Sequence, residues 1–305
     1  MKKFMVVSGF LGAGKTTSMV ALSDVINAKF SKACVIANDL GAKNLVDAKF
    51  SKACGCDTTE LTGQCICYQT ENLVDRLRRL MDHEHYDLVM SDIPGCGVGA
   101  LEHVYHKLDK EYPNEFELAP FMVVADPERL RAIMPEKADL NLPQEMNYLF
   151  SAQLQEADLI VLNKIDLLTA AQTEECLQFL KGICPDAAVF AISAKNRTNI
   201  DQVANYIMSH HAQLKTIDIG YGGSEFIAAE QKLSWYNRQI YAKICCKTFD
   251  GNEFLEDLVE SIRDKLKQHH RNVPHLKVYA DATDGTACKI SLLGVDYEMQ
   301  VDSRL

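Results

Sequence analysis

A glycine-rich segment near the start of the chain constrains the fold more than any other feature. Gly9-Phe-Leu-Gly-Ala-Gly-Lys-Thr16 fits the pattern G-x-x-x-x-G-K-[ST] and lies between the apolar run Phe4–Ser8 and the helical pattern Thr17–Ile26. Glycines let backbone N–H groups converge on phosphate oxygens, and the following helix N-terminus adds partial positive charge. The segment therefore predicts a phosphate-binding loop between a buried strand and a helix.

The residue types in this loop indicate separate roles. Lys15 is expected to reach the β- and γ-phosphates of a nucleotide, and the Thr16 hydroxyl to be a ligand of Mg²⁺. Nucleotide contacts are expected from the loop and the first helical turn, at Gly9, Gly12, Ala13, Gly14, Lys15, Thr16 and Thr17.

Short apolar runs alternate with helical patterns through the first 215 residues. The runs are Phe4–Ser8, Ala33–Ala37, Leu88–Ser91, Pro120–Ala125, Leu159–Leu162 and Val189–Ile192, and the helical patterns include Asn72–Met81 and Ala171–Ile183. Continuous apolar strands separated by helices indicate a mostly parallel sheet covered on both faces. The expected fold class is α/β: a P-loop nucleoside-triphosphatase domain with flanking helices, followed by a small α+β domain.

The alternation stops at the glycine-containing stretch 216–229, which we interpret as a linker between a P-loop domain over 1–215 and an α+β domain over 230–305. In the second domain the pattern predicts a helix at Glu253–Gln268 and strands at Gln239–Cys246, Leu276–Ala280, Ala287–Leu293 and Tyr297–Val301. The chain stops directly after the last of these strands, as a truncated domain would. An identical heptapeptide at 28–34 and 48–54 is interpreted as a local duplication.

Composition excludes several classes of partner. The chain has 32 Lys and Arg against 42 Asp and Glu, a net charge of −10, which argues against a general binder of nucleic acid or anionic membranes. No apolar run approaches the roughly 20 residues needed to span a bilayer. The 11 cysteines are an odd number in a chain without an export signal, which favours reduced thiols or metal ligands over disulfides. We therefore expect the protein to be cytoplasmic.

Two segments after predicted strands point to guanine. In Asn163-Lys164-Ile165-Asp166 the carboxylate of Asp166 can accept both N1–H and the exocyclic amino group of guanine, whereas adenine presents an acceptor there. Ser193-Ala194-Lys195, after the next strand, would place a backbone N–H on the guanine O6. The sequence therefore favours GTP over ATP.

Two further segments supply carboxylates on the metal side of the phosphates. Asp92-Ile-Pro-Gly95 follows the strand Leu88–Ser91, where a Mg²⁺-side acid and a γ-phosphate-sensing Gly95 would lie. Asn38-Asp39-Leu-Gly41 is a candidate switch segment, with a helix cap or turn as the alternative. The predicted Mg²⁺ site is Thr16, Asp92 and Asp39, and the predicted catalytic groups are Lys15, Asp92 and Asp39. No residue identifies itself as the group that orients the attacking water.

Four cysteines lie close together in the sequence between the second strand and the next long helix. Cys54-Gly-Cys56 and Cys65-Ile-Cys67 place these thiols within fourteen residues. Thiolates select Zn²⁺, Cu⁺ or iron–sulfur clusters, and four of them can close a tetrahedral site. Packing of small apolar side chains is the alternative interpretation.

Taken in order, these motifs resemble the CobW/HypB/UreG family of P-loop GTPases and are most similar to its CobW-like metallochaperone branch. The resemblance covers residues 1–215 well and the C-terminal domain loosely. It implies hydrolysis of GTP by water with Mg²⁺, nucleotide-linked homodimers, and delivery of Zn²⁺, Co²⁺ or Ni²⁺ to a client protein or cofactor pathway.

The chain departs from the family pattern at the metal-binding segment. Members generally carry Glu-Leu-x-x-Gly-Cys-x-Cys-Cys, whereas this chain reads Glu60-Leu-Thr-Gly-Gln-Cys-Ile-Cys-Tyr68. Gln64 therefore replaces a glycine and Tyr68 replaces the third cysteine, while Asp92 and Asp39 replace glutamates. Cys65 and Cys67 are the predicted ligands of the transition metal, and Cys54 or Cys56 is the hypothesis for the missing thiolate.

Two other functions remain open at this point. One is a GTPase switch for the assembly or reactivation of a cofactor enzyme, such as a corrinoid enzyme, with the cysteines serving structure alone. The other is a small-molecule kinase, which the guanine motif opposes.

Overall fold

The computed structural model describes residues 2–41, 46–135, 143–245 and 249–305, and these form two compact units, 1–232 and 233–305. The predicted linker, 216–229, contains most of a helix, α9 (Ser224–Gln231), whose Phe226 and Ala229 are buried. Within the described residues, no helix is both long and apolar enough to cross a bilayer.

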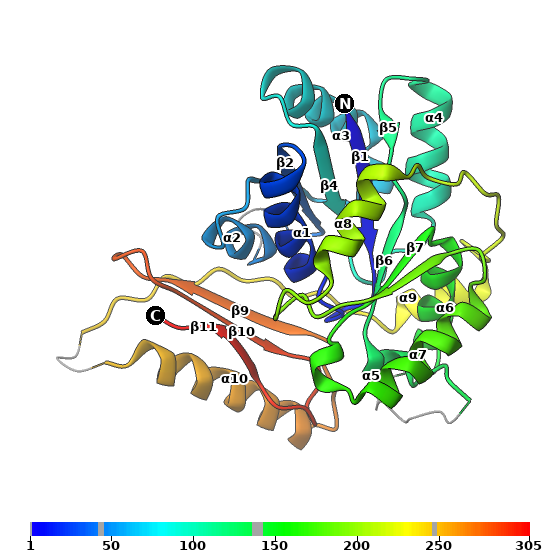
Figure 1. Cartoon of the computed structure of the whole chain (residues 1–305). Helices are drawn as coiled ribbons and strands as arrows, with labels where there is room; N and C mark the ends of the chain where they lie inside the picture. Colours follow the sequence, from blue (N-terminus) through cyan, green and yellow to red (C-terminus); the bar gives the residue numbers. More distant parts are fainter. Residues whose placement is uncertain (1, 42–45, 136–142, 246–248) are drawn as a thin grey trace. The chain divides into compact units, whose positions relative to one another are not determined.

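The first unit is built on a parallel sheet of eight strands within the described residues (Figure 1). Its order is β3-β2-β4-β1-β6-β7-β8, with β5 also pairing β1. The strands are β1 (Lys3–Ser8), β2 (Ala33–Asp39), β3 (Thr58–Thr62), β4 (Leu88–Asp92), β5 (Glu117–Leu118), β6 (Met122–Ala125), β7 (Leu159–Leu162) and β8 (Ala188–Ala191). The predicted α/β fold class is confirmed.

Helices cover both faces of this sheet, as continuous apolar strands require. The helices are α1 (Lys15–Lys29), α2 (Val46–Ala53), α3 (Thr70–Arg78), α4 (Lys107–Glu111), α5 (Pro127–Leu130), α6 (Met146–Glu156), α7 (Ala170–Ile183) and α8 (Ile200–Ser209). Short 3₁₀ turns form η1 (Ile66–Tyr68) and η4 (Ile165–Leu167), and π-helical turns form η2 (Arg79–His83) and η3 (Leu101–His106). Alternate residues of β1 enter opposite cores: Met5 packs with α1 and α8, and Phe4 packs with α3 and η3.

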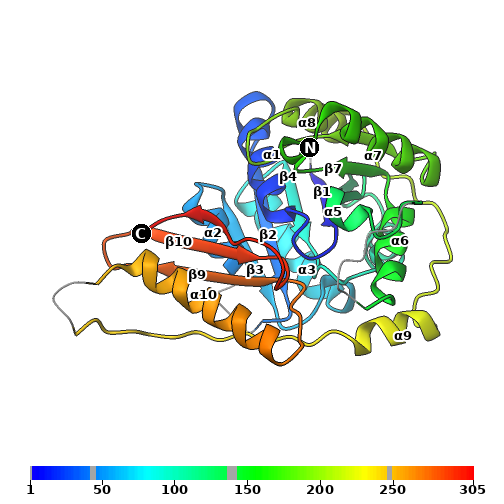
Figure 2. The ribbon, with the colours of Figure 1, turned by 90° about the horizontal axis from the view of Figure 1, so that it is seen from below.

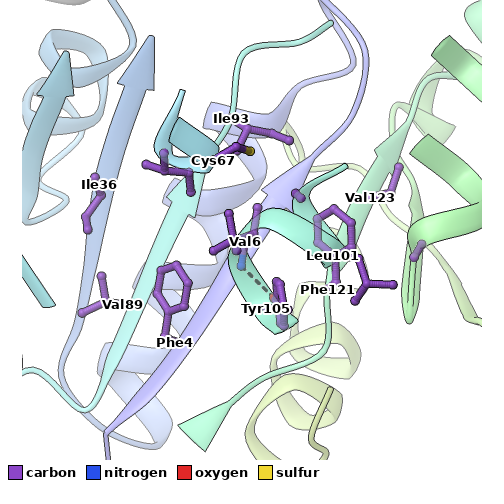
Figure 3. Packing of buried hydrophobic residues seen from close by; sticks show 14 of the residues in the cluster. Phe4, Val6, Ile36, Cys67, Val89, Ile93, Leu101, Tyr105, Phe121 and Val123 are labelled. Atoms are coloured by element: carbon purple, nitrogen blue, oxygen red, sulfur yellow. Dashed lines mark hydrogen bonds between the residues drawn. The ribbon is translucent and has the colours of Figure 1, made fainter. Parts of the chain in front are cut away.

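A buried tyrosine hydroxyl accepts a hydrogen bond from a backbone N–H of β1 that lies between two strand pairings. β1 pairs with β5 through Lys3 and Phe4 and with β6 through Val7 and Ser8, so Val6 lies between the two pairings. The Val6 N–H donates to the hydroxyl of Tyr105, on η3, at 2.9 Å (Figure 3). A buried N–H without a partner lowers the free energy of unfolding, so this bond stabilises the fold. It also connects η3 to the central strand β1.

The second unit is a three-stranded antiparallel sheet, within the described residues, packed against one helix (Figure 2). The elements are α10 (Gly251–Gln268), β9 (Leu276–Asp281), β10 (Ala287–Leu292) and β11 (Gln300–Ser303). Leu255 and Val259 of α10 pack on Cys288, Ile290 and Leu292 of β10.

Two of the predicted strands in this unit need correction. The strand predicted at Gln239–Cys246 is wrong over 239–245, which are irregular, and residue 246 lies outside the described residues. Its apolar side chains, among them Ile240 and Tyr241, are exposed, so no buried face fixes a strand there. The last strand begins at Gln300 rather than Tyr297 because the Tyr297 N–H closes a turn onto Gly294.

Candidate functional site

The parallel sheet brings the predicted site residues to one edge. The phosphate loop follows β1, Asp39 ends β2, Asp92 ends β4, Asn163 follows β7 and Ser193 follows β8. In a parallel sheet the carboxyl ends of the strands lie on the same side, which is where ligands bind in open α/β folds. Segments far apart in the sequence therefore converge at this edge.

The phosphate loop is fixed by close backbone contacts. Gly9 has φ +136°, and a Cβ atom there would lie 2.3 Å from the Val124 carbonyl oxygen of β6, so a side chain does not fit. The Lys15 ammonium donates to the Gly9 carbonyl at 2.6 Å. Thr16 and Thr17 stand at the start of α1, where helix N–H groups lack intrahelical partners.

Asn163 joins this loop to the segment predicted to bind guanine. Its side-chain amide donates to the Ala13 carbonyl at 2.9 Å, and its Oδ1 accepts from the Ala194 N–H at 3.0 Å. Asn163 is buried, so both bonds are shielded from water. Its side chain therefore joins the phosphate loop to the segment that follows β8.

The groups predicted to contact guanine lie together. The exposed Asp166 carboxylate accepts a 2.6 Å hydrogen bond from the Ser193 hydroxyl, which itself accepts from the Asn196 N–H at 3.1 Å. Lys164 has φ +63°, and its ammonium lies 2.5 Å from the Asp126 carboxylate at the end of β6. The Ser193 hydroxyl therefore binds one oxygen of the Asp166 carboxylate.

Asp126 is a site residue that the sequence reasoning missed. It caps α5 by accepting from the Glu128 N–H at 2.8 Å and the Arg129 N–H at 3.2 Å. Asp followed by Pro is a helix-start signal and was available in the sequence. The ion pair with Lys164 was not, because it spans separate strands.

The Asp92 segment contacts the phosphate loop directly. A Cβ atom on Gly95 would lie 2.8 Å from the backbone nitrogen of Leu11, so residue 95 can approach the loop only as glycine. Gln153 of α6 donates to the carbonyls of Gly95 and Gly97, each at 3.0 Å. We call residues 93–100 the post-β4 segment.

A buried carboxylate fixes the end of the post-β4 segment. Glu156 closes α6, is 2% exposed, and accepts from the Gly99 N–H at 2.8 Å and the Leu101 N–H at 3.0 Å. Burial raises the pKa of Glu156 to about 7, although the two backbone bonds oppose the shift. Nothing in the sequence around Glu156 indicates this role, which depends on contacts 55 and 57 residues away.

Asn38 connects the Asp92 carboxylate to the segment that carries Cys65 and Cys67, residues 63–68, which we call the cysteine loop. The Asn38 N–H donates to Asp92 Oδ1 at 2.6 Å. Its side-chain amide donates to the carbonyls of Leu61 and Gln64 at 3.0 and 2.8 Å, and its Oδ1 accepts from the Ile66 N–H at 3.0 Å. One residue therefore bonds to both the Asp92 carboxylate and the cysteine loop.

The two thiols of the cysteine loop lie against each other. The Sγ atoms of Cys65 and Cys67 are 3.1 Å apart, and both residues are buried in the core beside Ile93 (Figure 3). The hydrogen bond between the thiols lowers the pKa of Cys65, and the same bond together with burial raises the pKa of Cys67.

Tyr68 points away from this pair. It is 65% exposed, and its hydroxyl is hydrogen-bonded to that of Tyr221. The Tyr221 ring packs on His103 and Phe226, with ring centroids 4.5 and 4.7 Å apart. The stretch before α9 is therefore anchored to the cysteine loop, which the interpretation of 216–229 as a linker did not anticipate.

Cys56 lies apart from Cys65 and Cys67 in this structure, and the hypothesis that Cys54 or Cys56 supplies the missing thiolate stays a prediction. Cys56 precedes β3 and packs in the core on the α1 side of the sheet, whereas Cys65 follows β3 and packs in the opposite core. Five residues of strand at about 3.3 Å each separate the two ends. Within the described residues, no three His, Cys, Asp or Glu side chains are placed to hold one metal ion.

A family model described as the CobW/HypB/UreG nucleotide-binding domain matches residues 3–191. The chain belongs to the CobW/HypB/UreG family. The predicted family is confirmed.

Individual relatives match part of the chain. A protein named zinc chaperone CobW from Sinorhizobium is 29% identical over 187 residues, which cover 54% of this chain and 51% of that protein. Another protein of the same name, from Pseudomonas aeruginosa, is 28% identical over 210 residues, which cover 62% of this chain and 55% of that protein. The chain thus spans about half the length of the curated relatives it matches. The structure of HypB from Helicobacter pylori in complex with nickel superposes with a TM-score of 0.47 at 19% identity, covering 67% of this chain and 85% of that one.

Proposed function

We propose that this chain, as a member of the CobW/HypB/UreG family, binds GTP with Mg²⁺, hydrolyses it to GDP and phosphate, and uses this cycle to carry a transition metal ion to a client. The family and the geometry of the nucleotide edge support the first part. The cysteine loop, and the zinc chaperones among the relatives, support the second.

The observation that carries the proposal is the set of bonds made by Asn38. One residue binds the Asp92 carboxylate through its backbone and the cysteine loop through its side chain. The order of Asp92 around a bound nucleotide therefore alters the position of the thiols. Coupling of this kind is reciprocal, so the metal changes the affinity for nucleotide by the same factor.

The nucleotide edge supplies groups for each part of GTP. Asp166, held by Ser193, accepts the two guanine donors, and the Lys15 ammonium stabilises charge on the transferred phosphoryl group. Thr16, Asp92 and Asp39 fit Mg²⁺, because they offer oxygen donors at one edge of the sheet, two of them from the adjacent strands β2 and β4. When bound, Mg²⁺ would neutralise charge on the β- and γ-phosphates.

The cysteine loop suits a cargo ion. Two adjacent thiols, one with a lowered pKa, provide soft donors of the kind that Zn²⁺ and its neighbours prefer. Two thiolates leave a tetrahedral ion incompletely bound, which allows transfer to a client with more donors. Association into homodimers upon GTP binding belongs to the same proposal.

The test is anaerobic competition of Zn²⁺, Co²⁺ and Ni²⁺ with a chromophoric chelator, with Mg²⁺–GTP and then Mg²⁺–GDP. Cys65→Ser/Cys67→Ser is the test variant, and Cys176→Ser, at a buried cysteine on α7, is its matched control. We expect binding that depends on the nucleotide and is lost in the double variant alone. Weak binding, indifferent to nucleotide and to both variants, would refute a metal carrier.

A second function is favoured by the burial of the same cysteines. Cys65 and Cys67 are 9% and 8% exposed and pack with Ile66, Leu73 and Ile93, as small apolar side chains do. In that case the chain is a GTPase switch whose cargo is a cofactor-dependent enzyme. GTP hydrolysis in a phosphate-release assay, together with no metal binding in the chelator competition, is the result that selects this function.

A further inference from the structure

Helix α6 contacts both the phosphate loop and the post-β4 segment through residues on one side of the helix. Phe150, Gln153 and Glu156 are spaced by three, so their side chains leave the helix in neighbouring directions. The Phe150 ring packs edge-on against the ring of Phe10 in the phosphate loop, with centroids 4.3 Å apart. Gln153 and Glu156 bind the backbone of the post-β4 segment. One helix therefore contacts two loops of the nucleotide edge.

The post-β4 segment begins with a closed turn whose peptide groups are held in place. The Gly97 N–H donates to the Pro94 carbonyl at 2.7 Å. The carbonyls of Gly95 and Gly97 accept from the Gln153 side chain, each at 3.0 Å. Because a peptide group is planar, a bound carbonyl also fixes the direction of the N–H that follows it. The Gly95 N–H, which follows the Pro94 carbonyl, is therefore fixed in direction.

The Gln153 side chain is suited to this role by its chemistry and its burial. It is 2% exposed, and the one nitrogen Nε2 donates to both carbonyls. A side-chain amide carries two N–H donors on that nitrogen, so both are used by the post-β4 segment. A glutamate or a methionine has the same length, but neither can donate two hydrogen bonds.

Gly95 also lies against the phosphate loop. A Cβ atom at this position would be 2.8 Å from the Leu11 backbone nitrogen, so the two backbones are in close contact. The position of Gly95 is thus set from two directions, by Leu11 of the loop and by Gln153 of α6. A backbone N–H held beside a phosphate loop is a ready donor to a phosphate oxygen.

We propose that Gln153 is a positioning residue for GTP hydrolysis, and that it acts by holding the Gly95 N–H against the γ-phosphate. The proposal rests on the proposed function. In the reaction a water oxygen bonds to the γ-phosphorus, and the bond from that phosphorus to the β–γ bridging oxygen breaks. GDP leaves, one proton of the water stays on the phosphate, and the other goes to solvent. Gln153 touches none of these atoms and contributes through the fixed backbone of Gly95.

The test compares Gln153→Met, which keeps the length of the side chain but removes both donors, with the wild type. Phosphate release from Mg²⁺–GTP gives kcat and KM, and calorimetry gives the affinity for Mg²⁺–GDP. We expect kcat to fall roughly 100-fold, since a misplacement of about 1 Å can cost that much. The ratio kcat/KM should fall equally, and GDP affinity should stay unchanged, because GDP has no γ-phosphate. Gln155→Met, at an exposed position on the same helix, is the matched control and should behave as the wild type.

A merely structural role predicts a different result, namely equal weakening of GTP and GDP binding with kcat unchanged. That result, or a wild-type kcat in Gln153→Met, would overturn the role of Gln153 and leave the GTPase standing. No hydrolysis by the wild type would overturn the proposed function as well.

A second measurement needs no substituted protein. Hydrogen exchange of the amides in residues 93–100 should be slower with a non-hydrolysable GTP analogue than with GDP, both with Mg²⁺. Equal exchange with the two nucleotides would show that this segment does not contact the γ-phosphate, and the proposal would fail.

Discussion

Ionisation of Glu156 is predicted to control the stability of the nucleotide-binding unit between pH 5 and pH 8. The carboxylate is buried and holds the amides of Gly99 and Leu101. Its pKa is about 7 in the folded chain and 4.5 for the free side chain. This difference corresponds to about 3 kcal/mol in favour of the protonated form, at 1.36 kcal/mol for each pH unit.

The sign of the effect follows from proton linkage. Between pH 4.5 and 7 the folded chain keeps a proton on Glu156 that the unfolded chain has lost, so the free energy of unfolding falls as the pH rises. The contribution is fully present below pH 4.5 and is lost as the pH passes 7. The total change is about 3 kcal/mol, and most of it should occur between pH 5 and 7.

The assay is denaturant unfolding followed by circular dichroism at several pH values, for the wild type and Glu156→Gln. The variant cannot ionise, and its amide nitrogen cannot accept from a backbone N–H, so it carries a constant penalty of about 1–3 kcal/mol. The difference between wild type and variant should therefore shrink, or change sign, by about 3 kcal/mol from pH 5 to pH 8. Glu174→Gln, at an exposed position on α7, is the control.

A difference that stays constant across this pH range would refute the reasoning. It would mean that Glu156 is already ionised at pH 5 and that its two backbone bonds outweigh burial. The post-β4 segment would then be held by a permanent charge rather than by a group that titrates near neutrality.

Three further predictions concern the nucleotide edge. Asp166→Asn should weaken GTP binding by about 1.5–3 kcal/mol, or roughly 10- to 150-fold, and should favour binding of xanthosine triphosphate. Calorimetry measures both affinities, and an equal loss of affinity for the two nucleotides would contradict the guanine contact. Gly95→Ala should destabilise the chain by about 1–3 kcal/mol and lower GTP affinity, because its Cβ would press on Leu11; unchanged affinity would argue against contact between this segment and the phosphate loop. Asn38→Ala should leave metal binding insensitive to nucleotide in the chelator competition, and coupling that persists would show that it runs elsewhere.

The phosphate loop and the parallel sheet could be predicted because their signals are local. Gly9 and Gly95 mark positions where backbones approach closely, and apolar runs mark strands that are covered on both faces. A short motif after a strand fixes which edge of the sheet its side chains occupy. The sequence therefore placed the nucleotide edge, though the roles of its individual side chains remain predictions.

Contacts between distant elements could not be predicted in this way. Glu156, Gln153 and Tyr221 act on segments far along the chain, and their own neighbours in sequence carry no motif. The same limit explains the missed separation of Cys56 from Cys65, since their spacing reveals neither the strand between them nor the face on which each packs.

The repeated heptapeptide shows the effect of context within one chain. Residues 28–34 end α1 and enter β2, whereas the identical residues 48–54 lie mostly within α2. In the first copy Ala33 pairs with Leu88 of β4, and its N–H donates to the Asn27 side chain at 2.8 Å. Tertiary pairing thus decides the conformation of a sequence whose local preference is the same in both places.

The hydrogen bond between Tyr68 and Tyr221 restricts which substitutions can occur at these two positions during evolution. A cysteine at position 68 would bring a thiolate to the loop but would remove the hydroxyl that anchors Tyr221 beside His103 and Phe226. Positions 68 and 221 are therefore expected to change together among homologues, with tyrosine at 221 favoured where 68 is tyrosine.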